Sequence, residues 1–324
     1  MQYEEKGKLI RGVGGLYEIE LAPGDTPLSG QCIKARAKGN FRHAGLSPLV
    51  GDVVRVGIDE SALSRDEAGK PCPSADGGGI VIEEILPRKN ALIRPPMANL
   101  DLLFITFAAA QPAPVPETID KLISIAEYNG IEPVIVIGKR DIAPEAAEML
   151  RKTYTVAGFS AFSLSAETGE GVGELREYIK QNLVGKTAAF AGASGVGKST
   201  LLNALFPSLS LQTGEISHRI ERGKHTTRRV ELYAMEGGYI ADTPGFSMLD
   251  FVRFDFFSRD DLVGTMREFE PYIGQCRYKK CTHTREEGCA ILQAVKTGDI
   301  AASRHQSFVA MFDALKNKHD WSKK

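Results

Sequence analysis

Short apolar segments separated by Gly, Pro and Asp residues run through the first 88 residues of the chain. Alternation at this spacing is typical of strands, and it suits a small barrel better than alternating strands and helices. We expect an all-β domain over residues 1–88, in which the polar stretch Leu63–Gly79 forms an exposed hairpin. The expected strands are Lys8–Val13, Leu16–Leu21, Gln31–Ala37, Val53–Ile58 and Gly79–Ile85.

From about residue 89 the apolar runs alternate with amphipathic stretches of helical period. This order predicts stacked βαβ units and a mainly parallel sheet, so we expect an α/β domain over residues 89–253. The expected strands are Leu102–Phe107, Val134–Ile137, Ala161–Leu164 and Thr187–Ala191, followed by a hairpin of Val230–Met235 and Tyr239–Ala241. The expected helices are Glu117–Tyr128, Pro144–Tyr154, Val172–Leu183 and Lys198–Leu205.

After about residue 250 the strand pattern ends, and three segments have helical character. They are Asp260–Phe269, Cys289–Thr297 and Ser303–Lys318. We therefore expect a separate helical domain over residues 254–324.

The composition excludes several classes of protein. Forty Lys and Arg residues balance 41 Asp and Glu residues, so a chain coated with positive charge for non-specific DNA binding is not expected. No apolar run reaches the ~20 residues that a membrane span needs, and the polar N-terminus has no secretory signal pattern. Five cysteines in 324 residues make a poor disulfide framework. We expect a cytoplasmic protein with no membrane partner.

A phosphate-binding motif follows the expected strand Thr187–Ala191 and opens the next helix. Its glycines let backbone N–H groups converge on nucleotide phosphates at the positive end of the helix dipole. In this pattern Lys198 reaches the β- and γ-phosphates and Ser199 holds Mg²⁺. The nucleotide-binding residues predicted here are Gly192, Ala193, Ser194, Gly195, Val196, Gly197, Lys198, Ser199 and Thr200.

A second motif, Asp242-Thr243-Pro244-Gly245, follows the apolar strand Tyr239–Ala241. An aspartate at the end of a buried strand about forty residues after a P-loop suits a Mg²⁺-linked carboxylate. Gly245 can offer its backbone N–H to the γ-phosphate. We therefore add Asp242 to the magnesium site and both residues to the nucleotide site.

Three cysteines and a histidine crowd into fourteen residues, as Cys276-x4-Cys281-x-His283-x5-Cys289. Three thiolates and one imidazole make a full tetrahedral set for Zn²⁺. Because such a set leaves no open coordination position, the expected role of the single zinc ion is structural. Arg277, Lys279 and Lys280 lie inside this loop, where they are candidates for RNA contacts.

The P-loop and the Asp242–Gly245 motif together resemble those of a GTPase. Asp242–Gly245 is similar to the third conserved element of translation-factor-related GTPases. Gly138-Lys139-Arg140-Asp141 resembles their base-specificity motif NKxD, and the segment from Ser165 and Ala166 to Gly169 resembles their fifth element, SAxTG. Both lie before the P-loop instead of after it. The order of elements is therefore four, five, one, two, three, which implies a circular permutation.

The whole chain resembles the ribosome small-subunit-dependent GTPase family, called RsgA in bacteria. The resemblance implies an N-terminal OB-fold barrel, a permuted P-loop GTPase domain and a C-terminal zinc-binding helical domain. It also implies hydrolysis of GTP to GDP, with Mg²⁺, during late maturation of the small ribosomal subunit. The implied partners are that subunit and its 16S rRNA, and we expect a monomer. In an OB-fold, the basic residues Lys34, Arg36 and Lys38 share one face of a strand, a place where such barrels bind nucleic acid.

The segment Gly223–Arg228 resembles the family's switch I, in which a threonine completes the Mg²⁺ shell. We assign that role to Thr227. Phe246 occupies the position where many GTPases carry a water-orienting glutamine, and a phenylalanine cannot orient water. The nearest polar candidate for catalysis is His225, which we group with Lys198 and Thr227.

One position departs from the family pattern, because the motif asparagine is Gly138 in this chain. Glycine can neither brace the P-loop nor contact the base, whereas Asp141 can still accept the guanine N–H groups and Lys139 can pack along the base. We expect a weakened guanine preference. Two alternatives stay open: a P-loop ATPase, and an RNA-binding scaffold that holds nucleotide without hydrolysing it.

Overall fold

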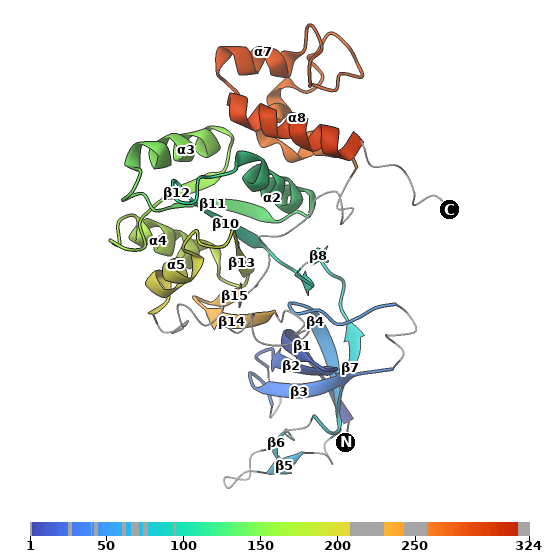
Figure 1. Cartoon of the computed structure of the whole chain (residues 1–324). Coiled ribbons are helices and arrows are strands. Elements are labelled where there is room, and N and C mark those ends of the chain that lie inside the picture. Colours follow the sequence, from blue (N-terminus) through green and yellow to red (C-terminus); the bar gives the residue numbers. More distant parts are fainter. Residues whose placement is uncertain are drawn as a thin grey trace. The chain divides into compact units, whose positions relative to one another are not determined.

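The structure is a computed structural model of the chain (Figure 1). It describes residues 2–24, 28–39, 41, 45–59, 63–65, 71–73, 77–93, 95–207, 230–242 and 258–316. Contacts between residues divide the chain into two compact units. Unit 1 comprises Met1–Asp101, Leu183–Ala189 and His225–Gly245, and unit 2 comprises Leu102–Asn182, Phe190–Lys224 and Phe246–Lys324. The division into three domains stays a prediction from the sequence.

Unit 1 contains a closed five-stranded barrel, which confirms the OB-like fold (Figure 1). The strand order is β1-β2-β3-β7-β4, and pairing of β1 with β4 closes the barrel. Strands β3 and β7 are parallel, and the other neighbours are antiparallel. Inward-facing aliphatic side chains fill the interior, among them Leu9, Ile19, Ile33 and Val54. The strands are β1 (Gln2–Val13), β2 (Leu16–Leu21), β3 (Cys32–Ala37), β4 (Val53–Asp59) and β7 (Ile80–Ile85).

The first strand begins earlier than its apolar pattern predicts. Residues Gln2 to Lys8 pair in register with Asp59 to Val53 on β4. Backbone hydrogen bonding to a neighbouring strand therefore supports a polar segment that has little apolar signal of its own. The expected hairpin in the polar stretch consists of β5 (Ser64–Arg65) and β6 (Pro71–Cys72).

Two further hairpins complete unit 1. One, formed by β8 (Ala91–Leu92) and β9 (Met97–Ala98), was not expected from the sequence. The other, β14 (Glu231–Met235) with β15 (Gly238–Asp242), confirms the prediction. Strand β15 runs parallel to the first residues of β13 (Thr187–Ala191).

Unit 2 contains the expected parallel sheet, in which β10, β11 and β12 are successive neighbours. Every residue of β10 is buried, as is typical of a parallel strand covered on both faces. Helices α2 and α3 lie over one face of the sheet, and α4 and α5 lie on the other (Figure 1). The elements are β10 (Leu102–Ala108), α2 (Pro116–Tyr128), β11 (Glu132–Gly138), α3 (Pro144–Val156), β12 (Ser160–Ser163), α4 (Val172–Asn182) and α5 (Lys198–Leu205).

The C-terminal part of unit 2 is helical but differs from the prediction in one place. The prediction of one helix over Asp260–Phe269 was wrong. The structure has two 3-10 turns there instead, η4 (Leu262–Thr265) and η5 (Arg267–Tyr272). Met266 separates them in an extended conformation, with φ −109° and ψ 93°, and its buried side chain joins the local core. The extended backbone at Met266 and the burial of its side chain therefore occur at the same residue. The α-helices are α7 (Ala290–Thr297) and α8 (Ala302–Lys316).

Helix α8 docks on α2 through buried charges. The Arg304 side chain is 1% exposed. Its guanidinium donates to Asp120 Oδ1 of α2 and to Glu268 Oε1 of η5, each at 2.6 Å. The Tyr154 hydroxyl donates to the same Asp120 oxygen at 3.1 Å. The C-terminal segment, residues 258–316, is thus attached to α2 by a fully desolvated network of ion pairs.

A second arginine strengthens the same attachment. Arg267 forms ion pairs with Glu127 of α2 at 2.6 Å and with Glu132 of β11 at 2.7 Å. Its guanidinium lies 4.8 Å from the ring centre of Phe159, and that of Arg304 lies 5.4 Å from the same ring. One aromatic side chain therefore contacts both cations.

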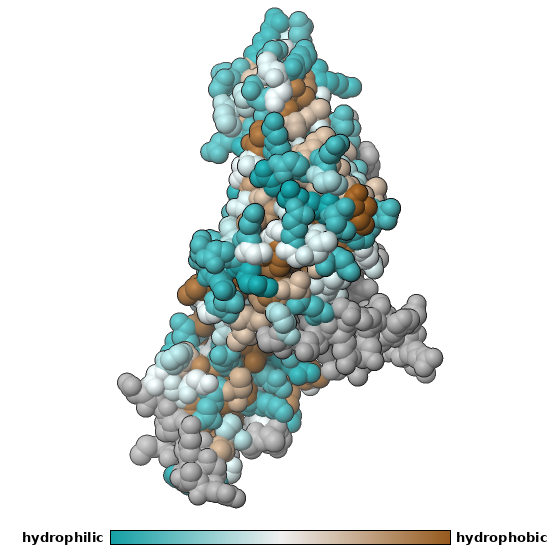
Figure 2. Space-filling model, turned by 90° about the vertical axis from the view of Figure 1, so that its left-hand side faces the viewer, coloured by the Kyte–Doolittle hydropathy of each residue, from teal (hydrophilic) through white to brown (hydrophobic). Residues whose placement is uncertain are grey.

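On the face drawn in Figure 2, hydrophilic residues predominate and hydrophobic residues occur in small scattered groups. Within the described part of the chain, no helix combines the length and the apolar character that crossing a membrane requires.

Candidate functional site

The phosphate-binding loop joins the end of β13 to the start of α5. Gly192 has a φ of 152°, and a Cβ atom there would lie 2.0 Å from the Thr106 carbonyl oxygen. Gly197 has a φ of 96° and caps α5 in the left-handed region. Both positions require glycine, and together they bring the loop backbone around the N-terminus of the helix. This geometry suits an anion such as a nucleotide phosphate.

The Lys198 ammonium is held over this loop by backbone oxygens. Its Nζ donates to the carbonyls of Gly192 at 2.6 Å and Ala193 at 2.9 Å. Burial lowers the pKa of Lys198 below its ordinary value, because desolvation disfavours the charged form. A phosphate in the loop would offset that loss by direct attraction.

A cavity of about 300 Å³ lies beside the loop in unit 2. Three sequence motifs line it, although they are far apart along the chain. The predicted residues that line it are Gly138, Lys139, Asp141, Ser165, Ala166, Val196, Gly197 and Thr200. The remaining lining residues were not among the predicted site residues; they are Thr106, Ile142, Leu164, Glu167 and Leu201, of which Glu167 lies inside the predicted motif from Ser165 to Gly169. Mixed apolar and convergent polar walls are typical of a ligand pocket.

The two loops on the far wall of the cavity are fastened to each other. The backbone N–H of Arg140 donates to the Leu164 carbonyl at 3.1 Å, and its side chain pairs with Glu170 at 3.3 Å. Arg140 therefore joins the loops and is absent from the cavity lining, although the sequence placed it among the nucleotide-binding residues. Lys139, in the left-handed region at φ 59°, donates to the Gln111 carbonyl, a contact that no motif indicated.

The loop after β12 forms a compact turn around Ser165. The Ser165 hydroxyl accepts a hydrogen bond from the Thr168 N–H at 3.2 Å, and its carbonyl accepts one from Gly169 at 3.0 Å. The buried serine thus organises its own loop, and Ala166 remains at the cavity wall.

The backbone of Gly138 leaves room for a side chain. A Cβ atom there would lie 3.6 Å from the Val196 carbonyl oxygen and 3.7 Å from that of Phe107, which are ordinary van der Waals distances. The glycine is therefore not required by the local fold. A polar side chain at this position would start next to the P-loop.

The other predicted residues of the P-loop and the first turn of α5 do not line this cavity; they are Gly192, Ala193, Ser194, Gly195, Lys198 and Ser199. The predicted residues after the P-loop lie at or beyond the end of a described range. Asp242 is the last residue of β15, where it pairs with Glu231. Gly245, His225, Thr227 and Phe246 lie outside the described residues, so their roles stay predictions.

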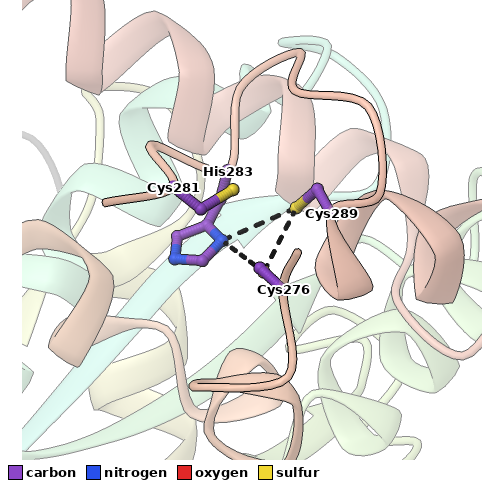
Figure 3. A group of neighbouring side chains, drawn as sticks. All are labelled: Cys276, Cys281, His283 and Cys289. Carbon is purple, nitrogen blue, oxygen red and sulfur yellow. Dashed lines mark hydrogen bonds between the residues drawn. The ribbon is translucent and has the colours of Figure 1, made fainter. Parts of the chain in front are cut away.

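The four predicted zinc ligands are brought together, and their side chains turn toward one another (Figure 3). The His283 Nδ1 atom lies 3.5 Å from Cys276 Sγ and 3.6 Å from Cys289 Sγ, and those two sulfurs are 3.8 Å apart. With Zn–S bonds of about 2.3 Å and Zn–N bonds of about 2.0 Å, a tetrahedral site has edges of about 3.8 Å and about 3.5 Å. The cluster therefore fits a zinc ion in size and in ligand type.

The surroundings of the cluster affect the charge on its thiols in two opposing ways. Burial, with hydrogen bonding among the thiols, raises the pKa of Cys281 to about 12. A bound cation would reverse this, because metal ligation requires thiolates. The Ala290 N–H points at Cys276 Sγ at 3.4 Å, an arrangement that stabilises negative charge on sulfur.

Two residues beside the cluster were missed by the sequence analysis. Burial alone would raise the pKa of Glu286, but hydrogen bonds from Thr282 and from backbone N–H groups outweigh it and lower the pKa to about 2. His305 of α8 contacts the backbone of His283. Neither belongs to a spacing pattern, so only the fold reveals them.

The basic face predicted on the barrel is present on β3. Ile33 and Ala35 face inward, whereas Lys34 and Arg36 lie on the other side of the strand and Lys38 follows its end. Lys38 is paired with Glu83 at 2.9 Å.

Comparison with known families gives two matches. The model for the RsgA GTPase matches residues 85–252, and the model for the RsgA N-terminal domain matches residues 6–64.

Among curated relatives, a small ribosomal subunit biogenesis GTPase RsgA from Caldanaerobacter subterraneus subsp. tengcongensis is 38% identical, over 97% of this chain and 96% of its own length. A protein of the same name from Streptococcus pyogenes is 35% identical over 98% of each chain.

Two solved structures share the fold. YjeQ from Thermotoga maritima has a TM-score of 0.72 and 31% identity, with 97% of this chain and 99% of that one covered. YloQ, described as a circularly permuted GTPase, has a TM-score of 0.73 and 28% identity, with 97% and 96% covered. The fold class expected from the sequence is confirmed.

Proposed function

Because the chain belongs to the RsgA family of GTPases, we propose that it hydrolyses GTP to GDP and phosphate in late maturation of the small ribosomal subunit. Docking to that subunit stimulates its activity. The protein acts as a monomer in the cytoplasm. The observation that carries this function is the shared cavity. The P-loop and the two loops that precede it in the chain line one pocket, in the arrangement that a permuted GTPase needs.

The phosphates bind at the N-terminus of α5. Backbone N–H groups of the loop from Gly192 to Gly197 face the β- and γ-phosphates, and Lys198 exchanges its two carbonyl partners for phosphate oxygens. The partly desolvated ammonium of Lys198 then hydrogen-bonds to a phosphate dianion in place of two neutral carbonyl groups. Because that attraction grows as negative charge accumulates on the phosphates, it favours the transition state of phosphoryl transfer.

The base binds in the adjoining cavity. The carboxylate of Asp141 accepts the guanine N1–H and amino hydrogens, and the stem of Lys139 packs along the ring. Ser165 and Ala166 line the same cavity. With Gly138 in place of an asparagine, recognition relies on Asp141 more than is usual in the family.

Magnesium is the expected cofactor, because hydroxyl and carboxylate oxygens are its preferred protein ligands. Ser199 at the start of α5, Asp242 at the end of β15 and Thr227 would hold it. When bound, the ion neutralises charge on the β- and γ-phosphates. His225 is the proposed polar group that replaces the water-orienting glutamine.

The rRNA partner is supported by exposed basic residues. Arg277, Lys279 and Lys280 are exposed on the zinc-binding loop, and Arg277 lies 5.6 Å from the ring centre of the exposed Tyr278. Cations beside an aromatic ring suit phosphates and unstacked bases of 16S rRNA. One zinc ion, bound by Cys276, Cys281, His283 and Cys289, holds this loop in shape.

Phosphate release from GTP and from ATP, with and without small ribosomal subunits, tests the function. We expect hydrolysis of GTP that rises when subunits are added. Faster release from ATP, with tighter binding of ADP than of GDP, would favour an ATPase. Nucleotide binding without release under any condition would favour an RNA-binding scaffold.

A further inference from the structure

The backbone on both sides of the zinc ligand His283 is held by one carboxylate. Glu286 accepts hydrogen bonds from the N–H groups of Thr282 at 2.8 Å and Thr284 at 3.1 Å, the residues that flank His283. It also accepts one from the Arg285 N–H at 3.1 Å. These bonds close a tight turn around a carboxylate that is not itself a ligand.

The carbonyl of His283 is held by a residue from another element. His305 of α8 places its Nε2 atom 2.7 Å from the His283 oxygen. Because a carbonyl only accepts, this nitrogen carries the hydrogen. His305 is 8% exposed, and its ring lies beside the rings of Phe269 and Phe308, so its orientation is set by packing.

These contacts matter because His283 adopts an unfavourable backbone conformation. Its φ is 61°, in the left-handed region that residues other than glycine seldom occupy. This conformation turns the ring so that Nδ1 faces Cys276 and Cys289. A free loop would leave the left-handed region much of the time, and metal binding would then have to restore it.

We propose that Glu286 and His305 are positioning residues for zinc, which hold His283 in its metal-binding conformation before the ion arrives. This role rests on the zinc site proposed for Cys276, Cys281, His283 and Cys289. Preorganisation of this kind raises affinity, because binding no longer includes the cost of ordering the ligand. Since His305 follows Arg304, the arginine that joins α8 to α2, the affinity for metal depends on the same helix that attaches the segment.

The first test compares two adjacent glutamates in the full-length protein. Zinc affinity is measured by competition with a colorimetric chelator for Glu286→Gln and for the control Glu287→Gln. The glutamine would present an N–H group to backbone donors, so we expect zinc binding ~10- to 100-fold weaker, as is typical for outer partners of metal ligands. The control should bind zinc as the unaltered protein does.

The second test uses α8. His305→Phe keeps an aromatic ring but removes the donor, whereas His305→Gln keeps a donor, and the exposed Gln306→Ala serves as the control. We expect weaker zinc binding for the phenylalanine variant, partial recovery for the glutamine variant and no change for the control. At saturating Co²⁺, the absorption bands of all three should match those of the unaltered protein, because the ligand set is intact.

Measurements on the metal-free protein distinguish the positioning role from a purely structural role of Glu286 and His305. A purely structural role would lower the melting temperature with and without zinc and leave zinc affinity unchanged. Affinities within two-fold of the unaltered protein for both Glu286→Gln and His305→Phe would overturn the positioning role. Absence of zinc binding by the unaltered protein would instead overturn the zinc site itself.

Discussion

The nucleotide loops and the C-terminal segment of unit 2 use charged side chains in opposite ways. In the loops, the ammonium groups of Lys139 and Lys198 are partly exposed and rest on neutral backbone carbonyls. In the C-terminal segment, Arg304 is fully buried and bound to two carboxylates, Asp120 and Glu268. The first kind of charge is free to exchange its partner for a ligand. The second kind is committed to the fold.

This difference predicts how each region responds to substitution. A lysine that rests on carbonyls can be removed with little effect on folding but a large effect on phosphate chemistry. An arginine in a desolvated pair cannot be removed without leaving buried, unpaired carboxylates. The zinc cluster resembles the arginine in this respect, because its three thiols and its imidazole converge on one point and are partly or fully buried.

The largest effect is expected on losing the metal site. Cys281→Ala should lose the single zinc ion, and the C-terminal segment should become sensitive to protease while GDP binding persists, because zinc binding supplies folding free energy. Elemental analysis and limited proteolysis check this. Finding no zinc in protein purified without chelators would contradict it, and Cys32→Ala, at an exposed cysteine of the barrel, is the control.

Arg304→Ala should destabilise the protein by about 3–5 kcal/mol, because it leaves the buried carboxylates of Asp120 and Glu268 without their cationic partner. Urea unfolding measures the change. Arg151→Ala, which removes an exposed pair with Glu148, is the control and should leave the midpoint unchanged. Equal effects of the two substitutions would contradict the claim that the buried pairs of Arg304 are required by the fold.

Lys198→Ala should lower subunit-stimulated GTP hydrolysis at least ~10²-fold, the usual cost of removing a group that stabilises charge in the transition state. Phosphate release measures it, and the melting temperature should be unchanged. The exposed Lys186→Ala is the control. Retained hydrolysis in the variant would show that the P-loop assignment is wrong.

The smallest effect is expected at Gly138. Gly138→Asn should tighten GDP binding, since its side chain starts 3.6 Å from the Val196 carbonyl and can donate to the P-loop. One added hydrogen bond of ~0.5–1.5 kcal/mol corresponds to roughly two- to twelve-fold in affinity. Fluorescent GDP titration measures the gain.

Asp141→Asn is the opposing variant in the same loop, and it should relax the preference for GDP over ADP. It replaces a carboxylate by an amide that presents donors to the donors of the base. If neither variant changes that preference, the loop Gly138–Asp141 does not read the base, and the permuted arrangement has been misassigned. If only Asp141→Asn changes nucleotide binding, another contact already holds the loop in place. The hydrogen bond from Lys139 to the Gln111 carbonyl is the first candidate.

The sequence by itself determined the features that depend on local pattern. Alternating apolar residues predicted the barrel and the parallel sheet, and Gly192 and Gly197 marked a loop whose backbone only glycine can form. The spacing of Cys276, Cys281 and His283 likewise indicated a metal cluster. Each signal lies within a few residues, so no knowledge of distant packing was needed.

The tertiary structure alone decided which distant residues meet. Arg304 and Asp120 are 184 positions apart, and nothing near either residue marks it as half of a buried pair. His305 reaches His283 because α8 packs beside the cluster, and the helix expected at Asp260–Phe269 is interrupted at Met266, whose side chain lies in the core. Periodicity and backbone requirements are written in neighbouring residues, whereas the partner of a charge and the burial of a side chain depend on how whole elements pack.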